Sequence, residues 1–434
     1  MYNMQNILSN NLKNHNGKKM MESSNKQKED INYEIIPEGT ITSVPGVLCC
    51  SCHCGIRKRK DDISVILIPG STACSGVFTK NTFAAAPVII CREQLASNRN
   101  INAIIINSGI ANACTGSEGL KNAKKTIEIA SVYLNLQKDN ILVSSTGRIG
   151  RQLPLEKIEK GIACCSKNLS AGNGHNTAKA ILTIDRHPKE FALQFLYDNK
   201  EIITGGIAKG SVMVEPDMAT TLSFIATNIS ISPGILDGIL SECVDDTFNC
   251  ISTDGCQSTN DMVIVIANGC SGAVLNDKNS PLYGYFKKAL HITLENLSRK
   301  VVEDGEGATK VIEIEIKKAY DKNEARSVGK KIANSVLFKS AMYGEDINWG
   351  RIAAAIGSVD NIDSSNVDIY LSGMLIMEKG MAKDYDEAAA SALLKERNIK
   401  FIIDLNKGNA TTKILTNDIS YEYIKINALY KKQK

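Results

Sequence analysis

The chain has 434 residues, of which 43% are hydrophobic and 23% charged, so it can bury a large core, and we expect two lobes. Its net charge of +4 is small for this length, and no basic stripe alternates with aromatic residues, which argues against nucleic acid as a partner. No apolar run approaches the roughly 20 residues of a membrane-spanning helix. The composition therefore indicates a soluble protein that does not enter the membrane.

Residues 1–33 are rich in Asn, Lys, Ser and Gln and carry almost no periodic apolar pattern, which predicts a disordered tail. Acidic residues are absent before Glu22, as in a transit peptide, but arginine is absent there too. We therefore expect a cytoplasmic protein. The mitochondrial matrix is the alternative if this segment is a transit peptide.

Short apolar runs at 63–70, 86–92 and 101–109 predict strands, and the run at 141–145 predicts another strand that ends at Thr146-Gly147. Apolar residues at helical spacing predict a helix over 118–136. Further helices are expected over 154–168, 232–252, 281–303 and 386–397 and around 326–342, and further strands at 220–225, near 367–376, at 401–406 and at 421–430. We expect Trp349 mainly to pack a tight turn. The alternation of strands and helices predicts an α/β fold.

The thirteen cysteines stand mostly among apolar or small residues, which indicates a reducing compartment rather than a disulfide framework. The tightest group reads CCSCHC at 49–54, and on a strand its alternate members share one face. A tetrahedral metal site normally needs a turn between ligand pairs and a second pair elsewhere. We therefore expect these cysteines to fill small packing positions, and zinc or copper binding is the alternative reading.

The stretch KGSVMVEPDMATTLSFIATN, residues 209–228, places a loop before a β-prone run and so delivers Ala219-Thr220 to the start of a strand. A hydroxyl held there can attack the preceding carbonyl, and hydrolysis of the resulting ester would make Thr220 a new N-terminus. Its free α-amine, with a pKa of about 7.7–8.0, would then serve as a base for the weakly nucleophilic hydroxyl. An ordinary strand containing Ala-Thr accounts for the dipeptide as well.

The letters around this dipeptide resemble the autoprocessing segment of the bifunctional ornithine acetyltransferase family, also called glutamate N-acetyltransferase. Six more strings stand in the family's order: NSGIANACTG, SSTGRIG, DGCQSTND, EDGEGATK, GEDINWGR and YEYIKINA. The resemblance covers roughly residues 39–430. It implies a layered αββα sandwich with a second, C-terminal lobe, cleaved between Ala219 and Thr220. The α chain would be 34–219 and the β chain 220–434, paired as an α2β2 heterotetramer.

The resemblance also implies the site. Thr220 is the nucleophile, Thr146 and Gly147 form the oxyanion hole, and the substrate-binding residues are Thr183, Lys209, Thr220, Glu306 and Asn427. Lys209 would hold a carboxylate of the substrate, Glu306 would bind an amine, and the polar residues 258–261 would belong to the site in a role that the sequence leaves open. The chain departs from the family's usual residues at Ile110, Val212, Glu215, Asp217 and Thr221. Of these, Glu215 and Asp217 place two carboxylates near the scissile bond, where they could alter the rate of self-cleavage.

The expected activity is a ping-pong transfer of acetyl from N2-acetylornithine to glutamate through acetyl-Thr220, as part of arginine biosynthesis. We expect no metal and no redox cofactor, because the chain has neither the phosphate-loop spacing G-x-x-x-x-G-K-[ST] nor a dinucleotide fingerprint. Use of acetyl-CoA as a donor is left open. Two alternatives also remain open: an N-terminal-nucleophile amidohydrolase or aminopeptidase, and an inactive, unprocessed binding protein.

Overall fold

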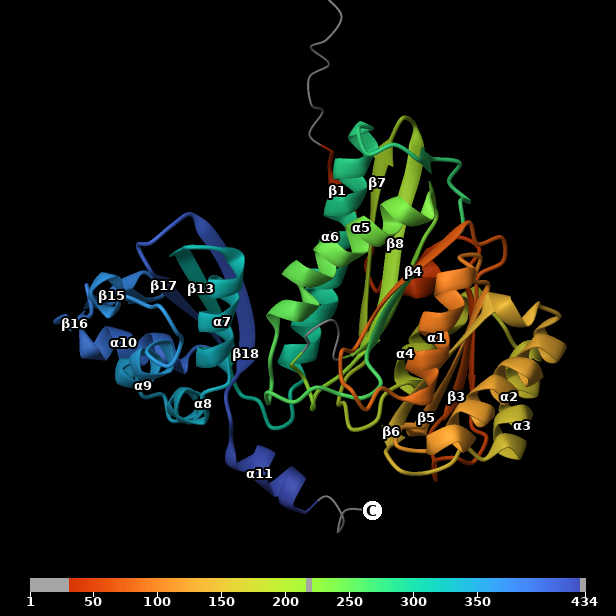
Figure 1. The fold of residues 1–434 in the computed structure, drawn as a ribbon, viewed down its shortest axis with the longest axis horizontal. Helices are drawn as coiled ribbons and strands as arrows, with labels where there is room; N and C mark the ends of the chain where they lie inside the picture. Colours follow the sequence, from red (N-terminus) through yellow and green to blue (C-terminus); the bar gives the residue numbers. More distant parts are fainter. Residues whose placement is uncertain (1–30, 216–220, 430–434) are drawn as a thin grey trace, which may run out of the picture. The chain divides into compact units, whose positions relative to one another are not determined.

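The structure is a computed structural model that describes residues 31–215 and 221–429. Three larger β-sheets are flanked by helices (Figure 1), which confirms the predicted α/β class. None of the helices in the described ranges combines the length and the apolar character needed to cross a membrane. The predicted cleavage site, Ala219-Thr220, lies outside the described residues, as does Asp217.

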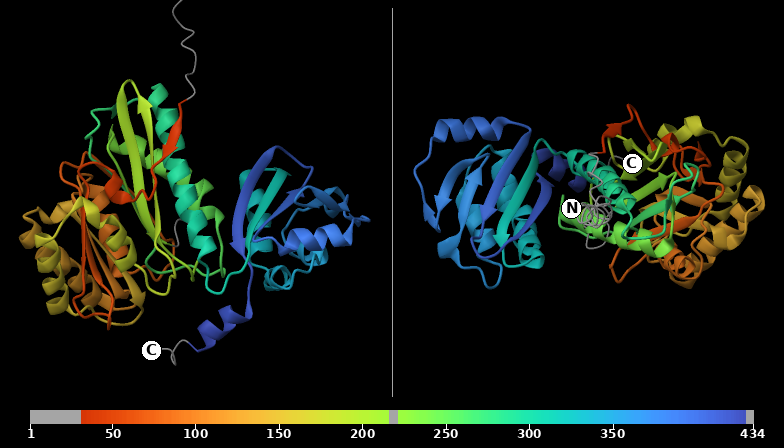
Figure 2. Two further views of the ribbon diagram at one scale, coloured as in Figure 1. Left: turned by 180° about the vertical axis from the view of Figure 1, so that it is seen from behind. Right: turned by 90° about the horizontal axis from the view of Figure 1, so that it is seen from above.

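The first sheet has six strands in the order β1-β7-β8-β9-β11-β4. Their bounds are β1 Tyr33–Ile35, β7 Lys189–Tyr197, β8 Lys200–Lys209, β9 Leu222–Thr227, β11 Met262–Ala267 and β4 Ala73–Phe78. Two predicted helices, α5 (Pro233–Asp246) and α6 (Pro281–Glu303), pack on this sheet, α5 along β4 and α6 along β7 and β8. Figure 2 shows α6 beside these strands from two further directions.

The second sheet has four strands in the order β2-β3-β5-β6, with bounds Leu48–Cys52, Ile63–Leu67, Ala103–Ile110 and Ile141–Arg148. Between the parallel strands β5 and β6 the chain forms α2 (Gly116–Leu134). Two more helices, α3 (Leu155–Lys167) and α4 (Gly174–Ala180), pack against β2 and β3. Side chains of both sheets, such as Ile106 and Phe224, belong to one hydrophobic cluster, so the two sheets share a core.

The segment 86–92, predicted as a strand, is instead the start of helix α1 (Ala86–Ser97). Its apolar run is too short for periodicity to separate a strand from a buried helix. The helical pattern appears only when the following residues are included, because Val88, Cys91 and Leu95 are buried at spacings of three and four. A proline at the first turn fits this start, since its missing N–H has no partner there in any helix.

The third sheet has six strands in the order β16-β15-β14-β17-β13-β18 and a hydrophobic core of its own. Their bounds are β16 Met381–Ala382, β15 Met374–Glu378, β14 Asp368–Leu371, β17 Asn398–Asp404, β13 Val311–Ala319 and β18 Ala410–Asn417. The helices here are α7 (Lys322–Ala333), α8 (Val336–Tyr343), α9 (Trp349–Ile356) and α10 (Glu387–Lys395). The helix expected around 326–342 is thus two helices, because the Ser335 hydroxyl accepts from Phe338 N and starts α8 anew. Trp349 begins α9 and packs against the core of this sheet. A pair of two-residue strands, β10 (Ser230–Ile231) and β12 (Val274–Leu275), completes the sheet structure of the described residues.

The segment 421–430, predicted as a strand, forms helix α11 (Tyr421–Ala428) over its described part. Tyr421 and Tyr423 favour a strand by residue type. The Ser420 hydroxyl, however, accepts from Tyr423 N and caps a helix. None of the α11 residues is buried, so no sheet packing opposes the cap. Asn427 therefore lies on a helix and not on a strand.

Candidate active site

A cavity of about 820 Å³ lies where the ends of β6 and β8 meet the start of β9. Five of the predicted site residues line it: Thr146, Gly147, Thr183, Lys209 and Asn427. Thr221, the described neighbour of the predicted nucleophile, lines it as well. Residues that are far apart in the sequence thus face one space.

The Thr146-Gly147 pair lies at the end of β6, where this strand runs parallel to β5 and Gly147 lies opposite Gly109. Gly147 has φ +130°, and a Cβ at this position would lie 2.3 Å from the carbonyl carbon of Gly109. Such a contact with backbone cannot be relieved by side-chain motion, so only glycine fits. The strand predicted to end at Thr146-Gly147 runs on to Arg148, and its pairing with β5 at Gly147 depends on this close approach of two backbones.

The Lys209 ammonium donates to Thr146 Oγ1 over 3.2 Å. Lys209 is the last residue of β8, and its partner hydroxyl is buried at the wall of the cavity. Because Oγ1 accepts from a cation, the hydroxyl proton of Thr146 can be donated into the cavity. The geometry thus joins Lys209 to the predicted oxyanion hole, a contact that the sequence did not reveal.

Thr183 lies in a bend between α4 and β7. Asp185 holds this bend, because its carboxylate accepts from Thr183 N at 3.2 Å and from Gly210 N at 2.6 Å. Burial favours a raised pKa for Asp185, but Lys209 and Lys189 together hold that pKa below its usual range. The ionised Asp185 therefore ties the Thr183 bend to the end of β8.

Two residues that sequence reasoning missed or left without a role also position the site. The guanidinium of Arg57 donates to Leu182 O at 2.7 Å and so supports the Thr183 bend; Arg57 stands in a basic run, GIRKRK, that matches no motif. The side-chain amide of Asn260 donates to Ala111 O at 2.6 Å and to Ser145 O at 2.8 Å. Asn260 thus holds the ends of β5 and β6 together beside the Thr-Gly pair, which gives the segment 258–261 a structural role.

Glu306 lies in the loop after α6, and it is not among the residues that line the cavity. Its carboxylate accepts from the side-chain amide of Asn427 at 2.8 Å, and Asn427 does line the cavity. Only 7% of Glu306 is exposed, and burial raises the pKa of its carboxyl, while the Asn427 hydrogen bond partly lowers it. The two residues form a polar group at one side of the cavity.

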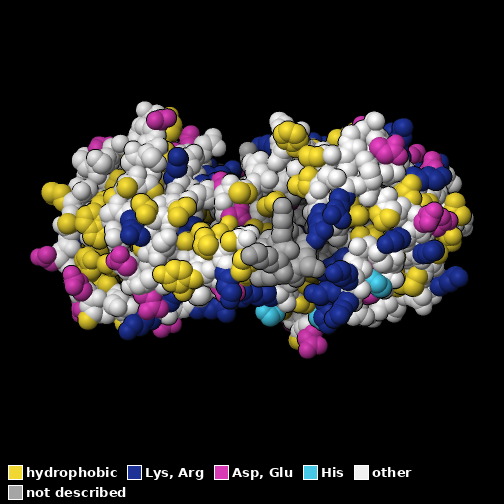
Figure 3. Space-filling model, turned by 90° about the horizontal axis from the view of Figure 1, so that it is seen from below, with side chains coloured by type: hydrophobic (Ala, Val, Ile, Leu, Met, Phe, Trp, Pro, Cys, Tyr) yellow, Lys and Arg dark blue, Asp and Glu magenta, His cyan; other side chains and the backbone are white. Residues whose placement is uncertain are grey.

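More basic than acidic side chains line the cavity. Arg148, Arg151 and Lys209 are basic, and Asp261 is the acidic residue among the described lining residues. Burial raises the pKa of Asp261 well above its usual range, although Lys209 opposes this shift. A cavity of this sign attracts carboxylates. Figure 3 shows that Lys and Arg side chains also gather in clusters on the molecular face that it displays.

The Glu215 carboxylate, which we expected near the scissile bond, is held by residues of α7 and its end. It accepts from the side-chain amide of Asn334 and lies 3.9 Å from the Lys330 ammonium. These contacts compensate its charge. Of the other departures, Val212 and Thr221 line the cavity.

Residues 48–432 match the model of the ArgJ family. The "Arginine biosynthesis bifunctional protein ArgJ" of Thermotoga neapolitana is 42% identical over 385 residues, which cover 87% of this chain and 97% of that protein. The protein of the same name from Bacillus subtilis is 39% identical over 394 residues, or 91% of this chain and 97% of its own. The solved ornithine acetyltransferase of Mycobacterium tuberculosis, complexed with ornithine, is 32% identical with a TM-score of 0.41, covering 43% of this chain and 100% of that chain.

Proposed function

The chain belongs to the ArgJ family and is an acyltransferase of arginine biosynthesis, and we propose that it moves the acetyl group of N2-acetylornithine to glutamate in two steps through Thr220. This proposal rests on the cavity, which is lined by Thr146, Gly147 and Lys209 together with Thr221. It offers hydrogen-bond donors and a positive charge next to the neighbour of the nucleophile. These are the groups that acyl transfer from an amide requires.

We propose that the chain first cleaves itself between Ala219 and Thr220, giving an α chain of 34–219 and a β chain of 220–434 that assemble as α2β2. The described residues on either side of the cleavage site, Gly210 and Thr221, support this proposal. Gly210 leaves room for Thr221, whose methyl group would lie 2.8 Å from a Cβ at position 210, and Thr221 lines the cavity. The core common to the first two sheets, with helices packed on each, supports a layered αββα arrangement for this lobe.

In the first half-reaction the Thr220 hydroxyl attacks the acetyl carbonyl carbon, and the α-amine of Thr220 takes up the hydroxyl proton. The negative charge that develops on the carbonyl oxygen is held by the Thr146 hydroxyl and by Gly147 N–H. Lys209, bonded to Thr146 Oγ1, orients that hydroxyl. The C–N bond then breaks, the amine returns its proton to the leaving nitrogen, and ornithine departs from an acetyl ester on Thr220.

In the second half-reaction the α-amine of glutamate attacks the ester. The same oxyanion donors act again, and the Thr220 α-amine takes a proton from the attacking nitrogen. It passes this proton to the Thr220 oxygen as the ester C–O bond breaks, and N-acetylglutamate leaves with the Thr220 hydroxyl restored. Neither step uses a metal or a redox cofactor, and acetyl-CoA enters only as an alternative donor of the acetyl group.

Recognition of the two amino acids follows from the charges around the cavity. Both carry a carboxylate, which Lys209 or the guanidinium groups of Arg148 and Arg151 can bind. The α-nitrogen of N2-acetylornithine is acylated and neutral, so its positive charge lies on the δ-ammonium. We propose that this ammonium binds at Glu306 and Asn427.

The test is an assay of both products with purified protein. With N2-acetylornithine and glutamate we expect ornithine and N-acetylglutamate in equal amounts, and without glutamate at most one ornithine per active site, because the acetyl-Thr220 ester accumulates. Continued release of ornithine and acetate without glutamate would instead establish the amidohydrolase. Absence of all turnover in fully cleaved protein would overturn the proposal.

A second prediction concerns pH. Because burial raises the pKa of Glu306, this carboxylate becomes protonated at a higher pH than an ordinary glutamate as the solution is acidified, and it then no longer attracts the δ-ammonium. The kcat/KM for N2-acetylornithine should therefore fall more on the acid side than protonation of the Thr220 α-amine alone predicts, and Glu306→Gln should raise KM and lack this additional fall.

Glu303→Gln is the matched control, because the Glu303 carboxylate pairs with Arg299 on the surface of α6, 2.9 Å from its Nε. It should keep both the wild-type KM and the wild-type pH profile. An acid fall that persists unchanged in Glu306→Gln would assign the titration to another group.

A further inference from the structure

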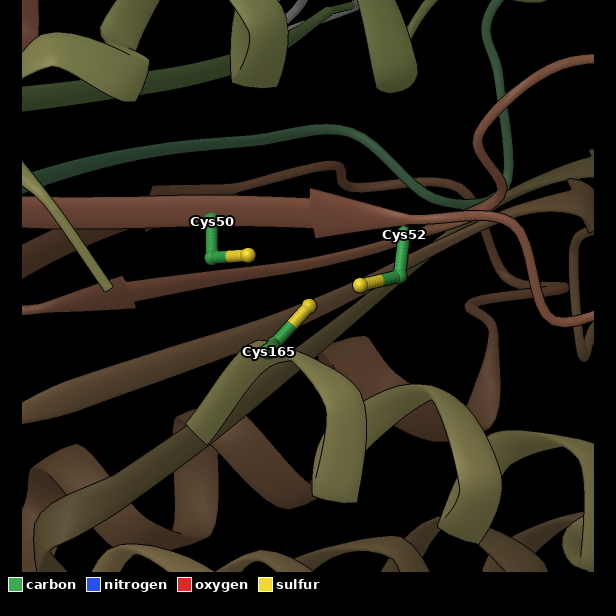
Figure 4. Close-up of side chains that lie close together, drawn as sticks. All are labelled: Cys50, Cys52 and Cys165. Carbon is green, nitrogen blue, oxygen red and sulfur yellow. The ribbon is translucent and has the colours of Figure 1, made fainter. Parts of the chain in front are cut away.

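Four cysteines from two distant segments meet beside the edge strand of the second sheet. Cys50 and Cys52 belong to β2, and Cys164 and Cys165 to the last turns of α3. Figure 4 shows the side chains of Cys50, Cys52 and Cys165 converging between the strand and the helix. We call these four residues the sulfur cluster. None of them lines the catalytic cavity.

Three of the four sulfur atoms are close enough to share one ion, and the fourth is bonded to one of these three. Those of Cys50, Cys52 and Cys165 lie within 4.8 Å of one another, and Cys52 forms a disulfide with Cys164. In the sequence, the segment 49–54 offers ligands from a single strand, which is too few for a tetrahedral metal site. The helix supplies the missing second pair.

A glycine brings the helix to the strand. At Gly161 a Cβ would lie 2.4 Å from Cγ2 of Ile63 and 3.0 Å from Cβ of Cys54, so a larger residue would push α3 away from the sheet. Cys165 follows Gly161 by four residues and so lies on the same face of the helix. The close packing at Gly161 therefore brings Cys165 into reach of β2.

The surroundings suit a thiolate site. Cys50 is 3% exposed and Cys165 is fully buried, while Cys52 is partly exposed and leaves an entry path from solvent. Thiolates are soft ligands that select zinc and other thiophilic cations over Mg²⁺ or Ca²⁺. With Zn–S bonds of about 2.3 Å, the sulfurs of a tetrahedral site stand roughly 3.8 Å apart, and those of Cys50, Cys52 and Cys165 lie within 4.8 Å of one another.

We propose that the sulfur cluster, once its disulfide is reduced, binds one Zn²⁺ ion through the thiolates of Cys50, Cys52, Cys164 and Cys165. A thiol or phosphine reductant supplies the two electrons that open the Cys52–Cys164 bond. Zinc then replaces the four thiol protons, which go to solvent. In the oxidised protein the sulfurs of Cys52 and Cys164 are bonded to each other and are not thiolates, so the site exists only in the reduced form. The ion joins β2 to α3 across 112 residues of sequence.

The experiment uses the purified full-length protein, with Co²⁺ as a spectroscopic probe and Zn²⁺ as competitor. After reduction with a phosphine, which takes up oxygen from water, one equivalent of Co²⁺ per chain should give the intense sulfur-to-cobalt and tetrahedral d–d absorption of a thiolate site, and Zn²⁺ should abolish it. The oxidised protein should give neither band. Absence of these bands in the reduced wild type would overturn the proposal.

Variants assign the ligands. Cys50→Ser and Cys165→Ser should weaken zinc binding by more than roughly 100-fold, since removing even an outer partner of a ligand can cost this much. The matched control is Cys49→Ser, whose thiol is fully buried on the same strand but does not belong to the group of clustered sulfurs. It should bind like the wild type, and equal affinities of Cys49→Ser and Cys165→Ser would contradict the assignment.

A measurement on the wild type decides the matter even if a variant does not fold. X-ray absorption at the zinc edge of the reduced, zinc-loaded protein should show four sulfur neighbours at about 2.3 Å. A shell of nitrogen and oxygen neighbours would place the metal elsewhere and overturn the proposal.

Discussion

Thr220→Ala is expected to give one uncut chain of 47.1 kDa with no acetyl transfer above background. The alanine lacks the hydroxyl that attacks the carbonyl of Ala219, so no new N-terminus forms. It also lacks the nucleophile for the acetyl group, so both reactions are lost together. Intact mass, a denaturing gel and the product assay measure this. In the wild type, the N-terminal sequence of the second fragment should begin at Thr220.

Two variants control for this result. Thr220→Ser keeps a hydroxyl and should still cleave, and Thr221→Ala should cleave as well. The Thr221 hydroxyl is buried and has no hydrogen-bond partner among the described residues, so its loss leaves no partner unsatisfied. Cleavage of Thr220→Ala at the same bond, or a wild-type chain that transfers acetyl groups while uncut, would contradict an N-terminal nucleophile.

The long helices were predictable, whereas two shorter helices, α1 and α11, were predicted as strands. The predictions for 118–136, 154–168 and 281–303 agree closely with α2, α3 and α6, because several turns of apolar spacing separate a helix from a strand. The predictions for α1 and α11 were wrong where a short apolar or aromatic run dominated the pattern. In α11 the deciding contact is the cap at Ser420, a single hydrogen bond that composition does not reveal.

The site also contains residues that could be predicted from the sequence and residues that could not. The resemblance pointed to Thr146, Gly147 and Lys209, which the fold does bring to one cavity. It could not point to Arg57 or give Asn260 its role, because the hydrogen bonds of both residues to backbone carbonyls span more than a hundred residues of sequence. Such contacts depend on which strand ends meet, and they leave no local pattern. The second pair of the sulfur cluster, on α3, was hidden for the same reason.

Removal of a hydrogen-bond donor from the predicted oxyanion hole should cause the second large loss of activity. Thr146→Val is expected to lower kcat by roughly 100- to 1000-fold, which corresponds to about 2.7–4 kcal/mol for one lost donor. Valine keeps the shape of threonine at this buried position but cannot donate to the developing oxyanion. Because the hydroxyl acts mainly in the transition state, KM should change little. Single-turnover release of ornithine without glutamate measures the effect on the first half-reaction alone.

Thr146→Ser is the matched control, since it removes a methyl group, keeps the hydroxyl and should retain most of the rate. A variant of Lys209 tests whether this residue acts by orienting the Thr146 hydroxyl or by its own positive charge. If its bond to Thr146 Oγ1 orients the donor, Lys209→Met should slow the wild-type enzyme but add little to the loss in Thr146→Val, because the two residues then act as one unit. Each rate must be divided by the cleaved fraction, since the same donors can assist self-cleavage. A Thr146→Val enzyme with wild-type kcat and a raised KM would make Thr146 a substrate-binding residue instead of an oxyanion donor.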